Sequence, residues 1–300
     1  MASFGDFLDV LGYDISSYIV GFLDNPADIV RVSSVSRSWR RFVIENGSSK
    51  KLCLKLFPEL SNAAYAIEAH SGIQLTSSSV LIDLENLSKK HKVYIFLALG
   101  LFPTARINCM SNAIKATSTI SRDMGIRNTL EPLEIGKEVS YWSSYGERND
   151  MVPETLKYKL ISNLCFITEI NIQPFQDSSQ TGHPIFSAKA VQFRVSYHNS
   201  MLRAVPRLHL ENEIEWTYLS PVFPMAQENG LQKFELPEPV LCIDGTLEIH
   251  FVGRVQRHRS DNLYYICVAH VQVVGRAFVP GFAKKLDHPR RWGELLSLGD

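Results

Sequence analysis

Residues 190–195 read Ala190-Val191-Gln192-Phe193-Arg194-Val195, and this stretch decides the fold class of the larger part of the chain. Its odd positions are apolar and two of its three even positions are polar, which is typical of a strand with one buried and one solvated face. Similar runs follow residue 105, the clearest being 155–161, 165–173, 188–197, 215–223, 231–236, 245–255 and 264–278. No helical segments of about 10–15 residues separate them, so we predict an antiparallel β-sandwich and not a parallel sheet.

Before residue 105 the apolar spacing is helical. A first stripe follows the i, i+3, i+4, i+7, i+8 pattern and consists of Ile15, Tyr18, Ile19, Phe22 and Leu23. Asn25 suits the cap of a second helix and Pro26 its first position. A third helix is expected to carry Val35, Trp39, Phe42 and Val43 on one face and to end at Asn46-Gly47. A longer helix is expected over residues 85–101, so the chain as a whole is predicted to be an α+β multidomain protein.

Composition and charge exclude several classes of protein. The 300 residues are 45% hydrophobic and 21% charged, which is ordinary for a globular chain and not for a disordered one. The 31 Lys and Arg balance 31 Asp and Glu, so no global field draws the chain to nucleic acid or an anionic membrane, and we expect neither partner. The five cysteines are scattered without a C-x-x-C pair, which predicts free, buried thiols. With no basic signal region at the N-terminus, we expect a cytosolic or nuclear protein.

The sequence offers little for catalysis. It contains no G-x-S-x-G elbow, no P-loop, no G-x-G-x-x-G and no H-E-x-x-H. Cys267 and His270 have a spacing that, on a strand, sends their side chains to opposite faces. His209 and Glu211 could share a face, but two ligands without a third are weak evidence for a metal. We therefore predict no catalytic residues, no metal and no cofactor.

One family resemblance lies in the helical part. Leu11-Gly12-Tyr13-Asp14-Ile15, followed by Ile19-Val20, Leu23 and Val35-Ser36-Arg37-Ser38-Trp39-Arg40-Arg41, resembles the F-box, a three-helix module of about forty residues. The pattern fits from Leu11 to Phe42 without a gap. It departs from the family at Gly12, where family members usually have Pro, and this departure is expected to loosen the first contact with the partner.

The resemblance implies a partner. A forty-residue helical piece cannot build an adequate core alone, so its apolar stripe needs company from another chain or domain. In the family that company is the Skp-type adaptor of a ubiquitin ligase, and through it cullin and a RING protein. The residues expected to bind the adaptor are Leu11, Gly12, Ile15, Ile19, Leu23, Val35 and Trp39. The alternative is that these helices form an internal three-helix bundle.

A second resemblance lies in the strand-rich part. Tyr141-Trp142-Ser143-Ser144, residues 156–160, residues 167–173 and the closing run 271–275 are similar to a discoidin or galactose-binding-like jelly roll. Together with Phe251-Val252-Gly253-Arg254-Val255-Gln256, they also resemble a group of plant F-box proteins with such a domain. The domains expected are an F-box over 7–57, a helical linker over 58–104, a β-sandwich for target recognition over 105–282 and a tail over 283–300.

The implied function is that of a substrate-recognition subunit of a Skp/cullin/F-box ubiquitin ligase, with an unknown protein target. Binding residues concentrate on loops, and the densest basic cluster consists of Arg254, Arg257, His258 and Arg259. These residues are the expected target contacts, unless they merely keep a hairpin turn soluble. Tyr141 and Trp142 are expected to pack in the core rather than to form a ligand platform. The alternative function is a carbohydrate- or glycoprotein-binding module, which would show aromatic faces with Asn, Asp or Gln on one loop end.

Overall fold

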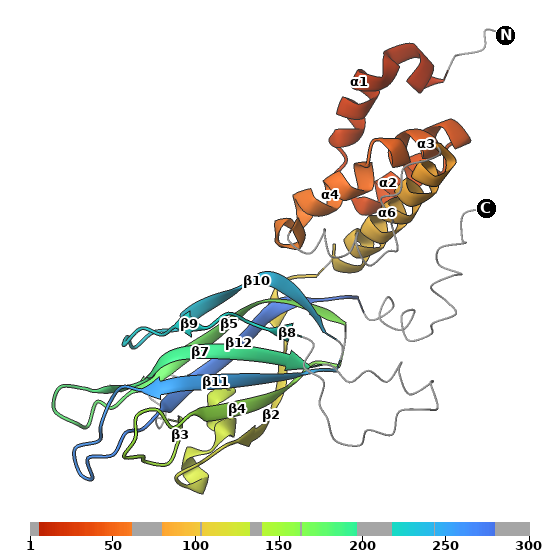
Figure 1. The fold of residues 1–300 in the computed structure, drawn as a ribbon. Helices are drawn as coiled ribbons and strands as arrows, with labels where there is room; N and C mark the ends of the chain where they lie inside the picture. Colours follow the sequence, from red (N-terminus) through yellow and green to blue (C-terminus); the bar gives the residue numbers. More distant parts are fainter. Residues whose placement is uncertain are drawn as a thin grey trace, which may run out of the picture. The chain divides into compact units, whose positions relative to one another are not determined.

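The computed structural model describes residues 6–61, 80–102, 104–132, 140–162, 164–196, 218–242 and 244–279. The chain divides into two compact units, one of Met1–Thr104 with Phe278–Asp300 and one of Ala105–Ala277. The first is helical and the second is built of strands, as the change in sequence pattern near residue 105 predicts (Figure 1). The expected tail over 283–300 and residues 215–217 of the expected strand over 215–223 lie outside the described residues, as do His209 and Glu211.

Short sequence signals set the bounds of the helices in the first unit. The Asn25 side chain accepts a hydrogen bond from the Ala27 N–H with Pro26 at the first position, as predicted, and Gly47 has the expected left-handed conformation (φ 58°). Val35 lies before the third helix, whose cap is Ser36, and not on its face as expected. The elements are α1 (Phe7–Gly21), α2 (Pro26–Ser33), α3 (Arg37–Glu45), α4 (Ser48–Leu56), η1 (Pro58–Leu60) and α6 (Val80–Leu101).

A break divides helix α1 at Gly12. Its dihedral angles, φ 72° and ψ 171°, lie in a region that is open only to glycine. The chain is helical on both sides of this residue, so Gly12 separates the first turn of α1 from the rest. Proline, which fixes φ near −65°, does not fit this conformation.

The core of the helical unit draws on five helices. Buried residues from α1 to α4 form it, namely Val20, Ile29, Phe42, Val43 and Leu52. Ile95 of α6 packs against this cluster, and α6 also contacts α2, α3 and α4. Helix α6, which the sequence places in a linker, therefore belongs to the same compact unit as α1–α4.

The second unit is the predicted antiparallel β-sandwich. One sheet, called sheet A here, has the strand order β1-β12-β5-β10, with β3 beside β12 and β6 beside β5. Sheet B has the order β2-β4-β11-β7-β8, with β9 beside β7, and every pairing is antiparallel. The strands are β1 (Ile107–Asn108), β2 (Met110–Ala116), β3 (Trp142–Ser143), β4 (Glu154–Leu160), β5 (Cys165–Gln176), β6 (Ile185–Phe186), β7 (Ala188–Ser196), β8 (Tyr218–Leu219), β9 (Phe223–Pro224), β10 (Gln232–Cys242), β11 (Thr246–Arg254) and β12 (Cys267–Ala277). Two short 3₁₀ turns, η2 (Arg122–Met124) and η3 (Ile126–Thr129), precede β3.

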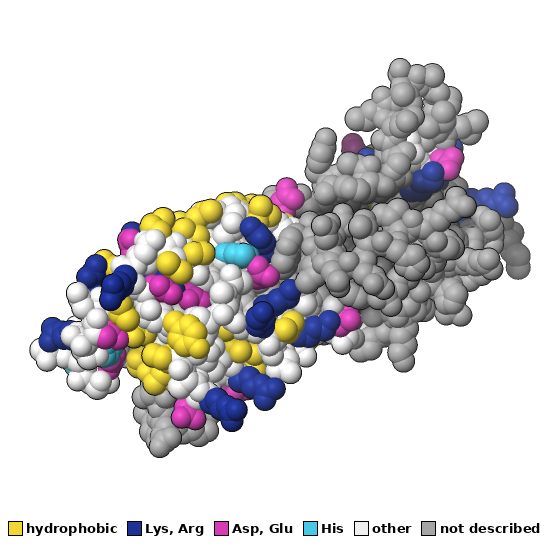
Figure 2. Space-filling model, turned by 60° about the horizontal axis from the view of Figure 1, so that its bottom comes forward, with side chains coloured by type: hydrophobic (Ala, Val, Ile, Leu, Met, Phe, Trp, Pro, Cys, Tyr) yellow, Lys and Arg dark blue, Asp and Glu magenta, His cyan; other side chains and the backbone are white. Residues whose placement is uncertain are grey.

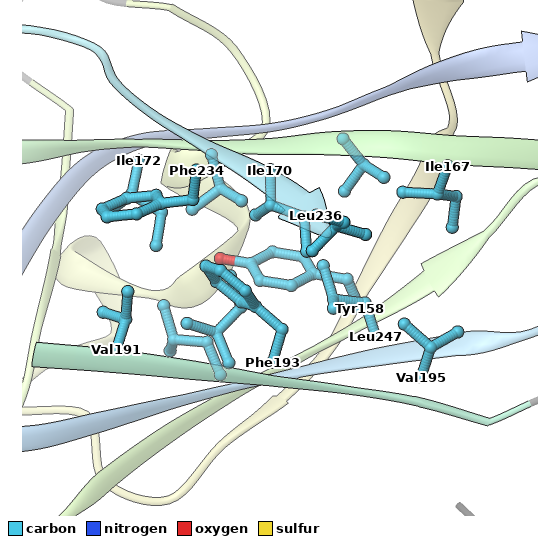
Figure 3. Close-up of a cluster of buried hydrophobic side chains, with 14 of the residues drawn as sticks. Tyr158, Ile167, Ile170, Ile172, Val191, Phe193, Val195, Phe234, Leu236 and Leu247 are labelled. Carbon is cyan, nitrogen blue, oxygen red and sulfur yellow. The ribbon is translucent and has the colours of Figure 1, made fainter. Parts of the chain in front are cut away.

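The inner faces of the two sheets form the core of the sandwich. Val191, Phe193 and Val195 of β7 are fully buried, which confirms the alternation on which the fold prediction rests. They face residues of sheet A such as Ile170 and Phe234 (Figure 3). Each fully buried side chain of this size contributes roughly 1.5–3 kcal/mol through the hydrophobic effect. All five cysteines are free and buried, as expected.

Candidate interaction surfaces

An exposed apolar face follows the second part of helix α1. Ile15, Tyr18, Ile19 and Phe22 are spaced i, i+3, i+4 and i+7, which puts them on one side of the helix, and all four are exposed. Tyr18 keeps 70% of its surface exposed and meets Phe22 edge to face, with ring centroids 4.8 Å apart. Tyr13 and Val30 are exposed as well. In the described part of the helical unit this α1 face has no packing partner.

The residues expected to bind the adaptor fall into two groups. Leu23 and Trp39 are partly buried and pack against the core of the unit. Leu11 is also partly buried, and Gly12 is exposed at the break in α1. The other three residues are Ile15, Ile19 and Val35. They are exposed and belong to no core cluster of the described chain, and Val35 has 66% of its surface exposed.

Trp39 links the beginning of α1 to α3. Its Nε1–H donates a hydrogen bond to Asp6 Oδ1 at 2.9 Å, and Asp6 also caps α1 by accepting from the Leu8 N–H. The Trp39 ring lies edge-on to the Phe42 ring. Tyr13 of α1 also contacts the Phe42 ring, with centroids 5.4 Å apart. The sequence does not predict this role, because the Asp6 side chain precedes the recognisable motif.

In the sandwich, the grouping of Arg254 with an exposed basic loop needs correction. Arg254 is fully buried, and its Nη2 donates to Glu154 Oε1 at 2.7 Å. Ser118 Oγ donates to the same carboxylate oxygen, also at 2.7 Å. The guanidinium donates further hydrogen bonds to Val152 O, Ser144 Oγ, Tyr145 O and Tyr264 O. Arg254 thus joins loops of the sandwich from inside and does not contact a partner.

The rest of the basic cluster lies on the loop after β11. Arg257 and Arg259 are exposed, and the Arg257 guanidinium stacks over the Tyr264 ring at 4.4 Å from its centroid. His258 is partly buried, with its ring centroid 6.0 Å from that of Phe186. The expected loop therefore presents two arginines, while its histidine packs inward.

Hydrogen bonds fix the shape of this loop. Tyr265 donates its hydroxyl to Asp261 Oδ2 at 2.5 Å, and the Leu263 N–H donates to Asp261 Oδ1. Burial and this carboxylate raise the pKa of Tyr265 to about 12. Burial alone would raise the pKa of Asp261, but the two hydrogen bonds outweigh it and lower the pKa below its usual value. Asn262 has a left-handed φ of 58°, a conformation that asparagine tolerates in tight turns.

An aromatic stack beside three amide side chains lies at the ends of β3 and β5. The rings of Tyr141 and Phe175 are parallel, with centroids 3.7 Å apart. Beside them Gln173 donates to Asn229 Oδ1, and Asn229 donates to Gln176 Oε1 at 2.8 Å. Tyr141 is only half-buried, and sequence reasoning missed its pairing with Phe175.

Trp142, the neighbour of Tyr141, packs inside the sandwich as expected. It is fully buried, stacks near Phe251 and donates from Nε1 to Ser118 O.

Cys267 and His270 do not converge on a common site. The Cys267 thiol donates a hydrogen bond to Ser143 Oγ, and the His270 imidazole lies beside Thr129 O. Within the described ranges no group of His, Cys, Asp and Glu side chains has the arrangement of a metal site.

Comparison with known proteins identifies the family. An F-box protein of Arabidopsis thaliana is 45% identical over 313 residues, which cover 98% of this chain and 83% of that relative. The chain belongs to the F-box protein family. No protein-family model matches this F-box protein. No helix in the described ranges is both long and apolar enough to cross a membrane.

Solved structures similar to this F-box protein include two modules from bacterial enzymes. A chitosan-binding module from a Paenibacillus chitosanase/glucanase is 12% identical, with a TM-score of 0.37, and the match covers 56% of this chain and 98% of that module. A family 32 carbohydrate-binding module from a Clostridium perfringens glycoside hydrolase is 18% identical, with a TM-score of 0.36, over 55% of this chain and 90% of that module.

Proposed function

We propose that the protein is a substrate-recognition subunit of a Skp/cullin/F-box ubiquitin ligase. The observation that carries this proposal is the exposed apolar face of α1, with Ile15, Tyr18, Ile19 and Phe22, in a chain of the F-box family. An apolar face of this kind marks a protein interaction site. Its occupant is a Skp-type adaptor, which contacts Leu11, Gly12, Ile15, Ile19, Leu23, Val35 and Trp39 and brings cullin and a RING protein.

In this proposal the sandwich captures the protein to be modified. The chain forms no bond itself and acts by proximity, because it holds a target lysine near the loaded ubiquitin-conjugating enzyme. Arg257, His258 and Arg259 are the proposed target contacts, supported by the exposure of both arginines. The complex would work in the cytoplasm or nucleus, in keeping with five free cysteines.

Binding of a purified Skp-type adaptor to the full chain tests this proposal. Ile19→Asp places a charge on the α1 face and is expected to lower the affinity at least a hundredfold, because burying an unpaired carboxylate is costly. Ile114→Asp on the sandwich is the matched control, since Ile19 is 40% and Ile114 is 48% exposed. Equal binding by both variants, or none by the wild type, would refute adaptor docking at this face.

A second candidate function, recognition of a carbohydrate or glycoprotein, is favoured by one observation. The stacked rings of Tyr141 and Phe175 lie beside the linked amides of Gln173, Asn229 and Gln176. Aromatic faces bind the apolar side of a sugar ring, and amides donate to and accept from its hydroxyls. A glycan array probed with the full chain tests this reading. Loss of the signal in Gln173→Ala/Asn229→Ala, and not in Gln256→Ala, would support it, whereas no signal for the wild type would refute it.

A further inference from the structure

The outer face of sheet B combines a row of cations with an apolar rim. On β11 the side chains of Leu247, Ile249 and Phe251 point into the core, so Glu248 and His250 point outward. By the same alternation, the side chain of Lys157 on β4 and those of Gln192 and Arg194 on β7 point outward. Figure 2 shows dark-blue Lys and Arg side chains and yellow hydrophobic ones on one face of this sandwich.

Strand register aligns the cations in one row. Glu248 lies opposite Lys157 on one side and Arg194 on the other. Lys115 of the edge strand β2 lies opposite Lys157. Because neighbouring strands are about 4.8 Å apart, the row from Lys115 to Arg194 spans about 14 Å.

The row carries more positive than negative charge. Among the described residues the row has one carboxylate, that of Glu248, which lies 3.9 Å from Lys157 and whose Oε1 lies 2.5 Å from His250 Nε2. Neither Lys115 nor Arg194 forms an ion pair with any carboxylate of the described chain. Lys159, the next cation on β4, is already paired with Asp244 at 2.8 Å.

The apolar rim follows the edge formed by β8 and β9. Arg194 lies opposite Leu219, and Ala190 lies opposite Pro224. Between these two positions Phe223 packs against the core, whereas Val222 is exposed. Leu219 and Val222 each keep 55% of their surface exposed, and Leu219 lies directly beside Arg194 at the end of the row.

We propose that this face binds an acidic segment of a protein partner that also carries large apolar side chains. The acidic residues of the segment pair with the cations of the row, and its apolar side chains pack against the rim. In an extended segment the side chains of one face repeat every 6.6–6.8 Å or so, so acidic residues at positions i and i+4 match the two ends of a row of about 14 Å. A nucleic acid backbone would leave the Leu219 and Val222 side chains without a partner, which is why the occupant is a polypeptide. The surface is separate from the α1 face and does not depend on the proposed ligase role.

A displayed library of random peptides, selected on the immobilised full chain, tests the proposal. The wild type is expected to enrich peptides that combine Asp or Glu with large apolar residues. Lys115→Glu/Arg194→Glu is expected to bind these peptides about tenfold or more weakly, because two attractions become repulsions. Leu219→Ser/Val222→Ser is expected to weaken binding as well. Arg148→Glu/Lys233→Glu, with the same change in charge at two exposed residues outside the row and the rim, is the control and keeps the affinity.

Circular dichroism and thermal unfolding establish that each variant is folded, and Lys115→Gln/Arg194→Gln replaces the charge reversal if that variant is not. Absence of enrichment by the wild type would overturn the proposal. So would equal binding by Lys115→Glu/Arg194→Glu, or a loss confined to the Arg148→Glu/Lys233→Glu control. A wild-type dimer that the charge reversal dissociates would assign the face to a second copy of the chain and would also overturn it.

Discussion

Replacement of Arg254 by methionine is expected to be among the most damaging single changes in the sandwich. Methionine has a similar length and fills much of the same space, so the change removes the cation and its donors without leaving a large void. Arg254 is buried against Glu154, whose carboxylate is also buried and whose Oε2 has no hydrogen-bond partner. The variant leaves this carboxylate inside the sandwich without its counter-charge.

The magnitude follows from two losses. Removing one member of a buried ion pair costs about 3–5 kcal/mol, because the other charge stays buried and unpaired. Three backbone carbonyls, those of Tyr145, Val152 and Tyr264, also lose a donor, and each lost hydrogen bond costs about 1 kcal/mol. Some of these carbonyls will bind water, so the expected loss is about 5 kcal/mol, or a Tm lower by roughly 10–20 °C.

Urea unfolding followed by far-ultraviolet circular dichroism measures the loss. Hydrogen exchange of amides in β11 and β12 assigns it to the sandwich rather than to the helices. Arg257→Met is the matched control, because its guanidinium is exposed and only stacks on Tyr264. It is expected to change the free energy of unfolding by less than about 1 kcal/mol. If Arg254→Met were no less stable than this control, the assignment of Arg254 as the internal link between loops would be wrong.

Three further predictions concern glycines and a histidine. Gly12→Ala is expected to destabilise the helical unit by about 1–3 kcal/mol in urea unfolding, because only glycine tolerates its φ of 72° and ψ of 171°. The control, Gly21→Ala at an open helical position, is expected to be neutral or stabilising. Gly275→Ala makes the new Cβ clash with the backbone oxygen of Phe166 in β5 and should lower the Tm of the sandwich, whereas Gly230→Ala meets open space and should not. Burial lowers the pKa of His91 from 6.5 to about 4, so the neutral form is favoured in the fold and its contribution to stability is lost as pH falls from about 6.5 to 4. An NMR titration of His91 that gave a pKa near 6.5 would contradict the last of these.

Much of the fold follows from local signals in the sequence. The cap at Asn25, the stop at Gly47 and the alternation in β7 each act within a few residues, so they can be read without knowledge of the tertiary structure. The helical spacing of Val35 and Trp39 predicts that Val35 belongs to the third helix, but the Ser36 side chain accepts a hydrogen bond from the Trp39 N–H and starts the helix later. A cap at this position outweighs apolar periodicity.

The interaction surfaces were less predictable, because they depend on contacts between distant residues. The sequence groups Arg254 with an exposed loop because Arg257, His258 and Arg259 follow it, yet its partner Glu154 is 100 residues away. The stack of Tyr141 on Phe175 joins the residue before β3 to strand β5, and no local pattern pairs these two segments. Loops could be recognised as candidates, but which of their side chains turn inward is decided by the packing of the whole sandwich.

The seven residues that resemble the adaptor-binding pattern do not have one common role, and this changes how substitutions there must be interpreted. Trp39 packs on the core and bonds to Asp6, so Trp39→Asp would disturb the helical unit itself as well as any contact with a partner. Ile19 is exposed and belongs to no core cluster of the described chain, so Ile19→Asp leaves the fold intact. Loss of adaptor binding in the Trp39 variant is therefore ambiguous, because an unfolded unit also fails to bind. Only a loss in the Ile19 variant, with thermal unfolding unchanged, separates docking from stability. The exposed part of the pattern, not its most recognisable part, carries the information about the partner.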